Sequence, residues 1–149
     1  MKIKLDLSET HPDDRDQYRE LARIARRLQK AHAEDLNVFC NTIRGSQRSG
    51  SHQGYCYWAG KFQGHVVLRV RDWLSKGLLR DVYDIKAKEG RWSEKPIGRA
   101  YGIGLLCHEM AHLIEKHHGY AHIGATADFL TDCVTWGYVT REEADKHTF

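Results

Sequence analysis

The chain has 149 residues, of which 41% are hydrophobic and 29% are charged, and its formal net charge is +3. This length suits one compact domain, residues 1–149, and the composition is that of an ordinary soluble globular protein. The mild positive charge permits contact with nucleic acid without requiring it. The first residues do not have the pattern of a signal peptide, and no stretch is apolar enough for a membrane span, so a cytoplasmic location is expected.

The N-terminal part of the chain predicts a strand followed by a helix. In residues 1–7, "MKIKLDL", apolar and polar residues alternate, as is typical of a strand. Pro12 stands at a first-turn position, and the acidic residues after it favour a helix start because of the helix dipole. Apolar residues then continue at helical spacing from Tyr18 to Ala31.

A basic stripe lies on the face of this predicted helix opposite its apolar residues. Its members are Arg19, Arg23, Arg26 and Lys30. Such a stripe can follow the phosphate backbone of DNA. Asp16 and Glu20 balance part of the charge, and we favour the simpler interpretation of a solvated helix face.

The middle of the chain predicts strands. Runs rich in β-branched and aromatic residues occupy 36–43, 55–60 and 65–70, and a Gly/Ser-rich loop extends from Arg44 to Gly54. A hairpin turn is expected at Gly60-Lys61 or a nearby residue. Because these strands are consecutive and closely spaced, we expect a small antiparallel or mixed sheet in a protein of the α+β class.

Helices are expected in most of the remaining chain. Residues 72–83, "DWLSKGLLRDVY", predict a short helix, and residues 84–98 a charged connection. A further helix should begin near Arg99 and end at about Lys116. Two short helices then finish the chain, and the last begins at a capping box formed by Thr140 with a glutamate three residues later.

A histidine-rich motif lies in this expected helix. His108, Glu109 and His112 spell HExxH in "CHEMAHLIEKHHGYAH", residues 107–122. Positions i and i+4 share a helix face, so both imidazoles can bind one zinc ion at about 2.0–2.1 Å. Glu109 lies about 100° further round the helix, where its carboxylate can act as a general base on a water without being a ligand. Structural core histidines or a solvated face are the alternative interpretation.

A catalytic zinc ion usually has three protein ligands and one open position. His118 is the favoured third ligand, provided that the helix ends before it and the chain turns back. Gly119 is expected to permit this turn through a positive φ angle. The alternative third ligands are His117, His122, Asp128 and Asp132.

The pattern of HExxH, five residues, then His118 and Gly119 resembles the SprT-like and WLM-type zinc metalloproteases. The match covers about residues 100–122 and, more weakly, 54–74. The resemblance implies a zincin-like fold and peptide-bond hydrolysis, with zinc on His108, His112 and His118 and Glu109 as the general base. In several branches of the family it also implies action on DNA-associated proteins.

The resemblance also implies a peptide-binding cleft. In zincins an edge strand beside the active-site helix binds an extended peptide by strand addition, and residues 64–70, "GHVVLRV", are our candidate for this edge. Trp58 and Phe62 are candidates for lining the cleft. Candidates for stabilising the oxyanion are Tyr101, His117, Tyr120 and His122.

The chain departs from the family in two respects. SprT-like proteins often carry a C-terminal zinc ribbon, but the four cysteines contain no CxxC pair and are expected to be reduced and mostly buried. His122 stands where the family often has an aromatic residue. The alternative function is a non-catalytic, zinc-stabilised module that binds protein or DNA, although such a module has no need of Glu109.

Overall fold

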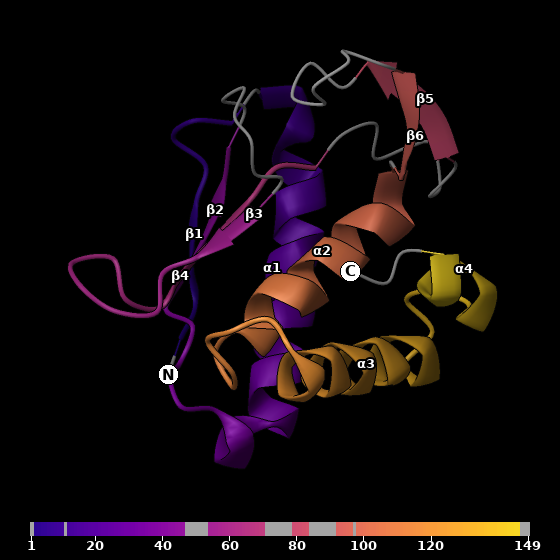
Figure 1. Ribbon diagram of the computed structural model, residues 1–149. Coiled ribbons are helices and arrows are strands. Elements are labelled where there is room, and N and C mark those ends of the chain that lie inside the picture. The colour runs from indigo at the N-terminus through magenta and orange to yellow at the C-terminus, as the bar shows by residue number, and fades with distance from the viewer. Residues whose placement is uncertain are drawn as a thin grey trace.

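A four-stranded mixed sheet occupies one side of the computed structural model (Figure 1). The model describes residues 2–10, 12–46, 54–70, 79–83, 92–96 and 98–146. The strands lie in the order β1-β2-β4-β3, with β1 parallel to β2, β2 parallel to β4, and β3 antiparallel to β4. Their bounds are β1 Lys4–Asp6, β2 Thr42–Gly45, β3 Gly54–Cys56 and β4 His65–Leu68.

Four α-helices accompany the sheet. Their bounds are α1 Arg15–Ala31, α2 Gly98–Ala111, α3 Tyr120–Thr135 and α4 Arg141–Lys146. Short 3₁₀ turns at Pro12–Asp14 and Ala33–Asp35 flank α1. The α+β class and the mixed sheet are therefore confirmed, as are the N-terminal strand and helix. None of the helices in the described part of the chain is both long and apolar enough to cross a membrane.

The core forms between the helices and one face of the sheet. Ile43 of β2 and Val66 and Leu68 of β4 are fully buried, and the residues between them along each strand are less buried, as the alternation of a strand requires. α1 contacts β1 and β2, whereas α2 contacts β3 and β4. This arrangement places α2, with its HExxH residues, beside the β3 edge of the sheet.

Helix α2 is buried on almost every side, because its sequence from Gly98 to Ala111 is apolar all round. Glu109 is the one charged residue among those that it buries. The long helix α1 is instead amphipathic and presents a buried stripe from Tyr18 to Leu28. A buried amide also ties α1 to the start of β2, because Gln29 donates to the Cys40 carbonyl at 2.9 Å and accepts from the Cys40 amide at 2.8 Å.

Two of the predicted elements are wrong. Residues 79–83 of the expected helix form the strand β5, Leu79–Tyr83, and the expected connection at 84–98 contains the strand β6, Trp92–Pro96. These two strands form a separate antiparallel ribbon. Pairing between segments distant in sequence decided this outcome over local helix preference. Residues 71–78 and 84–91 of these predictions lie outside the described residues.

The other predictions vary in accuracy. The Gly/Ser-rich loop is shorter than expected, since Arg44 and Gly45 belong to β2 and Gly54 to β3; residues 47–53 lie outside the described residues. The hairpin turn is confirmed by Gly60, with φ 84°. The helix after the histidine motif, α3, has 16 residues and is not short.

The C-terminal capping box and the state of the cysteines are confirmed. The Glu143 amide donates to Thr140 Oγ1 at 3.1 Å, and the Thr140 amide donates to Glu143 Oε1 at 3.0 Å.

All four cysteines are free. Cys40, Cys107 and Cys133 are buried, and Cys56 is half-buried.

Candidate metal centre

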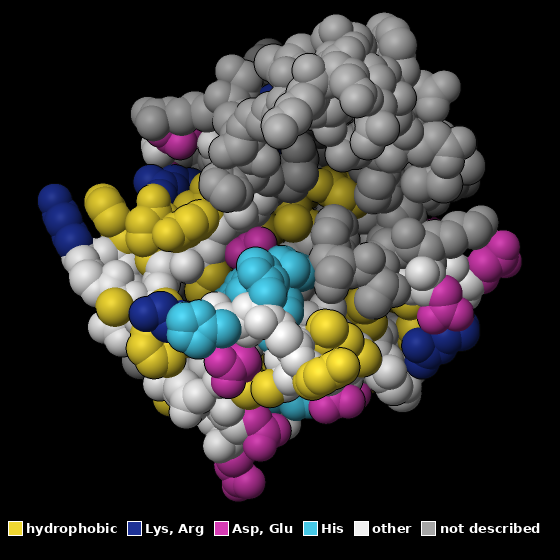
Figure 2. Space-filling view, viewed as in Figure 1, with side chains coloured by type: hydrophobic (Ala, Val, Ile, Leu, Met, Phe, Trp, Pro, Cys, Tyr) yellow, Lys and Arg dark blue, Asp and Glu magenta, His cyan; other side chains and the backbone are white. Residues whose placement is uncertain are grey.

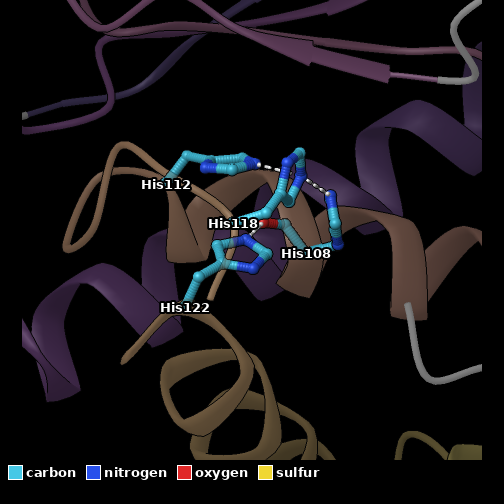
Figure 3. Close-up of side chains that lie close together, drawn as sticks. All are labelled: His108, His112, His118 and His122. Atoms are coloured by element: carbon cyan, nitrogen blue, oxygen red, sulfur yellow. Dashed lines mark hydrogen bonds between the residues drawn. The ribbon is translucent and has the colours of Figure 1, made fainter. Parts of the chain in front are cut away.

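Four histidines meet where α2, α3 and the loop between them converge (Figure 3). His108 lies on α2, His112 directly follows its last residue, His118 lies in the loop, and His122 lies in the first turn of α3. One ring nitrogen of each histidine lies within 4.8 Å of the corresponding atom of the other three. Figure 2 shows the histidines gathered in one patch near the centre of the molecular face.

The chain reverses because α2 ends at Ala111, five residues before the expected end at Lys116. The next three amides donate to carbonyls three residues back, at 3.2, 2.9 and 3.0 Å for His112, Leu113 and Ile114. Such bonds tighten the last turn of a helix into a 3₁₀ turn. His112 therefore stays one turn from His108, while the chain after it is free to turn away from the helix axis.

The loop before β2 fixes this turn in place. The Leu113 carbonyl accepts hydrogen bonds from the amides of Asn37 at 2.8 Å and Val38 at 3.1 Å. The Asn37 side-chain amide donates to the Ile114 carbonyl at 2.6 Å. The Leu113 side chain is fully buried. These contacts use the carbonyls that the helix leaves without partners, and they prevent it from continuing.

Gly119 does not act as predicted. Its φ of 161° belongs to extended backbone, which any residue can adopt, and a Cβ at this position would meet no atom within 4 Å. The reversal is complete before this residue. Gly119 instead precedes the first residue of α3, and its carbonyl accepts the Ile123 amide at 2.9 Å.

Two separations between ring nitrogens match those around a tetrahedral metal ion. His112 Nε2 lies 3.2 Å from His118 Nε2, which lies 3.3 Å from His108 Nε2. A tetrahedral zinc ion with zinc–nitrogen bonds of about 2.0–2.1 Å separates its ligand atoms by about 3.3 Å. One N–H of His118 cannot satisfy both neighbours in the absence of a metal. The donor set and its spacing therefore fit zinc.

The tautomer of His112 also suits a ligand. Its Nδ1 lies 3.1 Å from the Glu115 carbonyl, which can only accept, so Nδ1 carries the proton and Nε2 keeps its lone pair. Metal-bound histidines commonly make such a second hydrogen bond, which fixes the ring. Burial lowers the pKa of His112, which favours the neutral form that a metal requires.

His122 differs from the other three histidines. It is 1% exposed, and its Nε2 donates to the His108 carbonyl at 2.9 Å. Its ring stacks on His112 with centroids 4.0 Å apart and an interplanar angle of 24°. While this hydrogen bond is intact, Nε2 has no lone pair for a metal, and Nδ1 is the one atom of His122 that can act as a ligand.

Glu109 lies beside the cluster in the sheet-facing part of α2. It is 6% exposed, and its Oε1 lies 3.8 Å from His108 Nε2. Burial raises the pKa of Glu109 to about 8. Without a metal, burial therefore favours the protonated form of this carboxyl group at neutral pH.

Gly54 allows β3 to approach α2 at this point. A Cβ on Gly54 would lie 3.0 Å from Glu109 Cγ and 3.1 Å from Leu105 Cδ1. A side chain here would therefore displace the carboxylate or the strand. Sequence analysis missed this residue because it appeared as the last position of a Gly/Ser-rich loop.

Several sequence candidates lie outside the histidine cluster. Asp132 pairs with His32, Asp128 is exposed, and His117 is exposed with its backbone amide bonded to Glu115 Oε1 at 3.2 Å. Of the oxyanion candidates, Tyr101 is buried, with 3% of its surface exposed, whereas Tyr120 is 95% exposed. The structure thus brings together the three favoured ligands, His108, His112 and His118. It adds His122, which sequence analysis gave as an alternative third ligand.

Part of the basic stripe on α1 has partners within the protein. Arg19 pairs with Asp16 at 2.7 Å, and Arg26 donates to the Ile3 carbonyl at 2.9 Å. Arg23 and Lys30 are exposed. The contacts of Arg19 and Arg26 support the interpretation of the stripe as an ordinary helix surface.

No protein-family model, curated protein or solved structure matches this chain. The resemblance to SprT-like proteases therefore stays a prediction from the motif.

The burial of Glu109 is expected to lower the free energy of unfolding as the pH rises. Its folded pKa of about 8 exceeds the ordinary value of 4.5, so the folded state holds more protons between these values and loses stability as the pH rises through them. In chelator, we expect Glu109→Gln to be more stable than the wild type at pH 8 by on the order of 3 kcal/mol. The difference should vanish near pH 4.5. Urea unfolding across this range measures it, and a pH-independent difference would contradict the assigned cause.

The third ligand can be tested with adjacent histidines. His118→Ala should weaken zinc binding sharply, because its Nε2 lies close to both neighbouring ring nitrogens. His117→Ala should bind zinc nearly as the wild type does. Titration against a competing chelator measures both affinities. Equal affinities for the two variants would remove His118 from the ligand set.

Proposed function

We propose that the protein is a zinc-dependent metallopeptidase with a zincin-like fold, as the resemblance to SprT-like enzymes implies. The observation that carries the proposal is the convergence of three histidines beside a buried carboxyl group, with His118 Nε2 3.2 Å from His112 Nε2 and 3.3 Å from His108 Nε2. A purely structural metal site has no use for a buried Glu109, whose desolvation opposes folding. A hydrolytic site requires such a group.

A zinc ion held by these three histidines would polarise the scissile carbonyl and lower the pKa of a water molecule. Glu109 Oε1 lies 3.8 Å from His108 Nε2, one of the atoms that would hold the ion. Its carboxylate would accept the proton from the attacking water and pass it to the leaving amine. A zinc cation on the neighbouring His108 would favour the ionised form of Glu109, which is the form that accepts a proton.

The edge of the sheet supplies the surface for an extended substrate. The sequence candidate for the edge, residues 64–70, is wrong because β4 lies between β2 and β3. Within the described residues, β1 and β3 are the two outer strands, and β3 is the one that lies against α2. A polypeptide that adds to β3 as a further strand would pass beside Glu109, which fits peptide hydrolysis.

A second candidate function is a closed, non-catalytic metal site that stabilises a binding module for protein or DNA. It is favoured by the position of His122, one ring nitrogen of which lies within 4.8 Å of the other three ligand atoms. Four protein ligands are typical of structural zinc sites. The hydrogen bond from His122 Nε2 to the His108 carbonyl makes Nδ1 the ligand atom in such a site, and the buried Glu109 carboxyl group, which a structural site does not need, argues against this function.

Glu109→Gln tests the catalytic proposal. The amide keeps the size of the side chain but cannot accept the proton. We expect one zinc ion per chain, as in the wild type, and peptide hydrolysis reduced at least about 10²-fold. Zinc content and the turnover of an unfolded protein substrate are measured on the same samples. Hydrolysis at the wild-type rate would exclude Glu109 as the base.

His122 variants distinguish the two functions. His122→Gln keeps an N–H donor for the His108 carbonyl, whereas His122→Phe keeps the ring but removes the donor. If His122 only supports the ligands, the Co²⁺ absorption spectrum should be nearly unchanged in the Gln variant, and hydrolysis should be weaker in the Phe variant. If His122 is a ligand, both variants should change the cobalt spectrum equally and lose affinity for the metal.

A further inference from the structure

A row of aromatic side chains follows the β3–β4 hairpin next to the metal centre. Its members are Tyr55, Tyr57, Phe62 and His65, here called the aromatic row. Their ring centroids lie 4.8 Å apart for Tyr55 and Tyr57, 5.5 Å for Tyr57 and Phe62, and 5.3 Å for Phe62 and His65. Each ring thus contacts the next, and the row forms one continuous surface.

The aromatic row and the metal centre lie on opposite sides of the same edge strand. Gly54 faces Glu109, and Cys56 packs against the core. Tyr55 lies between them in β3, so its side chain points to the other face of the sheet. Tyr57 shares that face, and its amide donates to the carbonyl of His65, opposite it on β4, at 2.9 Å.

The row is open to solvent and is accompanied by cations. Tyr55 is 49% exposed and Phe62 is 38% exposed. Arg44 and Lys61 lie over the Phe62 ring, 5.7 and 5.6 Å from its centroid.

We propose that the aromatic row selects substrates: it binds aromatic side chains of the polypeptide segment that adds to β3. This inference rests on the proposed function. In an added strand, successive side chains point to opposite faces. If one side chain lies on the α2 side near Glu109, its neighbours on either side lie on the face of Tyr55, within reach of a cross-strand ring contact.

The proposal assigns Tyr55 the leading part, because it is the most exposed member of the row and belongs to β3 itself. Its neighbours Gly54 and Cys56 point toward α2, so one segment can contact Tyr55 and pass the metal centre. The protein should therefore prefer unfolded segments with aromatic residues at alternate positions over segments with small residues there.

Binding can be measured without catalysis. Two fluorescein-labelled peptides alternate Phe with Gln or Ala with Gln, and their binding to the protein in chelator is followed by fluorescence anisotropy. We expect the wild type to bind the Phe peptide about five-fold more tightly. Tyr55→Phe, the matched control, should keep this preference because it keeps the ring.

Tyr55→Thr should reduce the preference to below about two-fold, since threonine suits a strand but has no ring. Phe62→Ser, a loop substitution, should weaken the preference in the same direction. An unchanged preference in both variants would overturn the proposal. A change in the oligomeric state of Tyr55→Thr, measured by size exclusion, would instead identify a second copy of the chain as the occupant and also overturn it.

Hydrolysis of the same peptides by zinc-loaded protein separates this inference from the proposed function. Cleavage of both peptides at equal rates would support the peptidase and overturn the aromatic preference. Tyr55-dependent binding of the Phe peptide without any cleavage would support the aromatic surface and overturn the peptidase. Faster cleavage of the Phe peptide, lost in Tyr55→Thr, would support both.

Discussion

The early end of α2 is the constraint on which the candidate site depends. A helix continued through residue 118 would carry His118 about 120° out of line with His112, where the two rings could not share a metal. The turn after Ala111 is held by the buried Leu113 side chain and by the Asn37 and Val38 amides that bond to its carbonyl. Asn37 and Val38, which lie outside the HExxH motif, thus help to determine that His118 meets His108 and His112.

The packing of α2 determines the chemistry of Glu109 in a similar way. A helix buried all round holds this carboxyl group away from water, and the glycine at position 54 brings β3 against it. The same burial that raises its pKa weakens the fold as the pH rises. Such a cost is typical of functional sites and uncommon in structural ones.

Whether His122 is a fourth metal ligand decides between the catalytic and the structural interpretation of the site. Its ring contacts His108 and His112, and its Nε2 is engaged by a backbone carbonyl. In that state Nδ1 carries the lone pair of this ring. The catalytic interpretation leaves the fourth position of a tetrahedral ion open for water, whereas the structural interpretation fills it with His122 Nδ1, so the two predict different metal spectra.

The sequence by itself determined the local features of this protein: the N-terminal strand and helix, the hairpin turn, the capping box at Thr140, and the pairing of His108 with His112. Each depends on residues a few positions apart, whose spacing is set by one helix or turn. Tertiary structure decided the rest. The strands β5 and β6, the end of α2, the inclusion of His122 and the edge position of β3 depend on contacts between distant segments. Local patterns do not encode such contacts, because the free energy that selects them comes from pairing and burial in the folded chain.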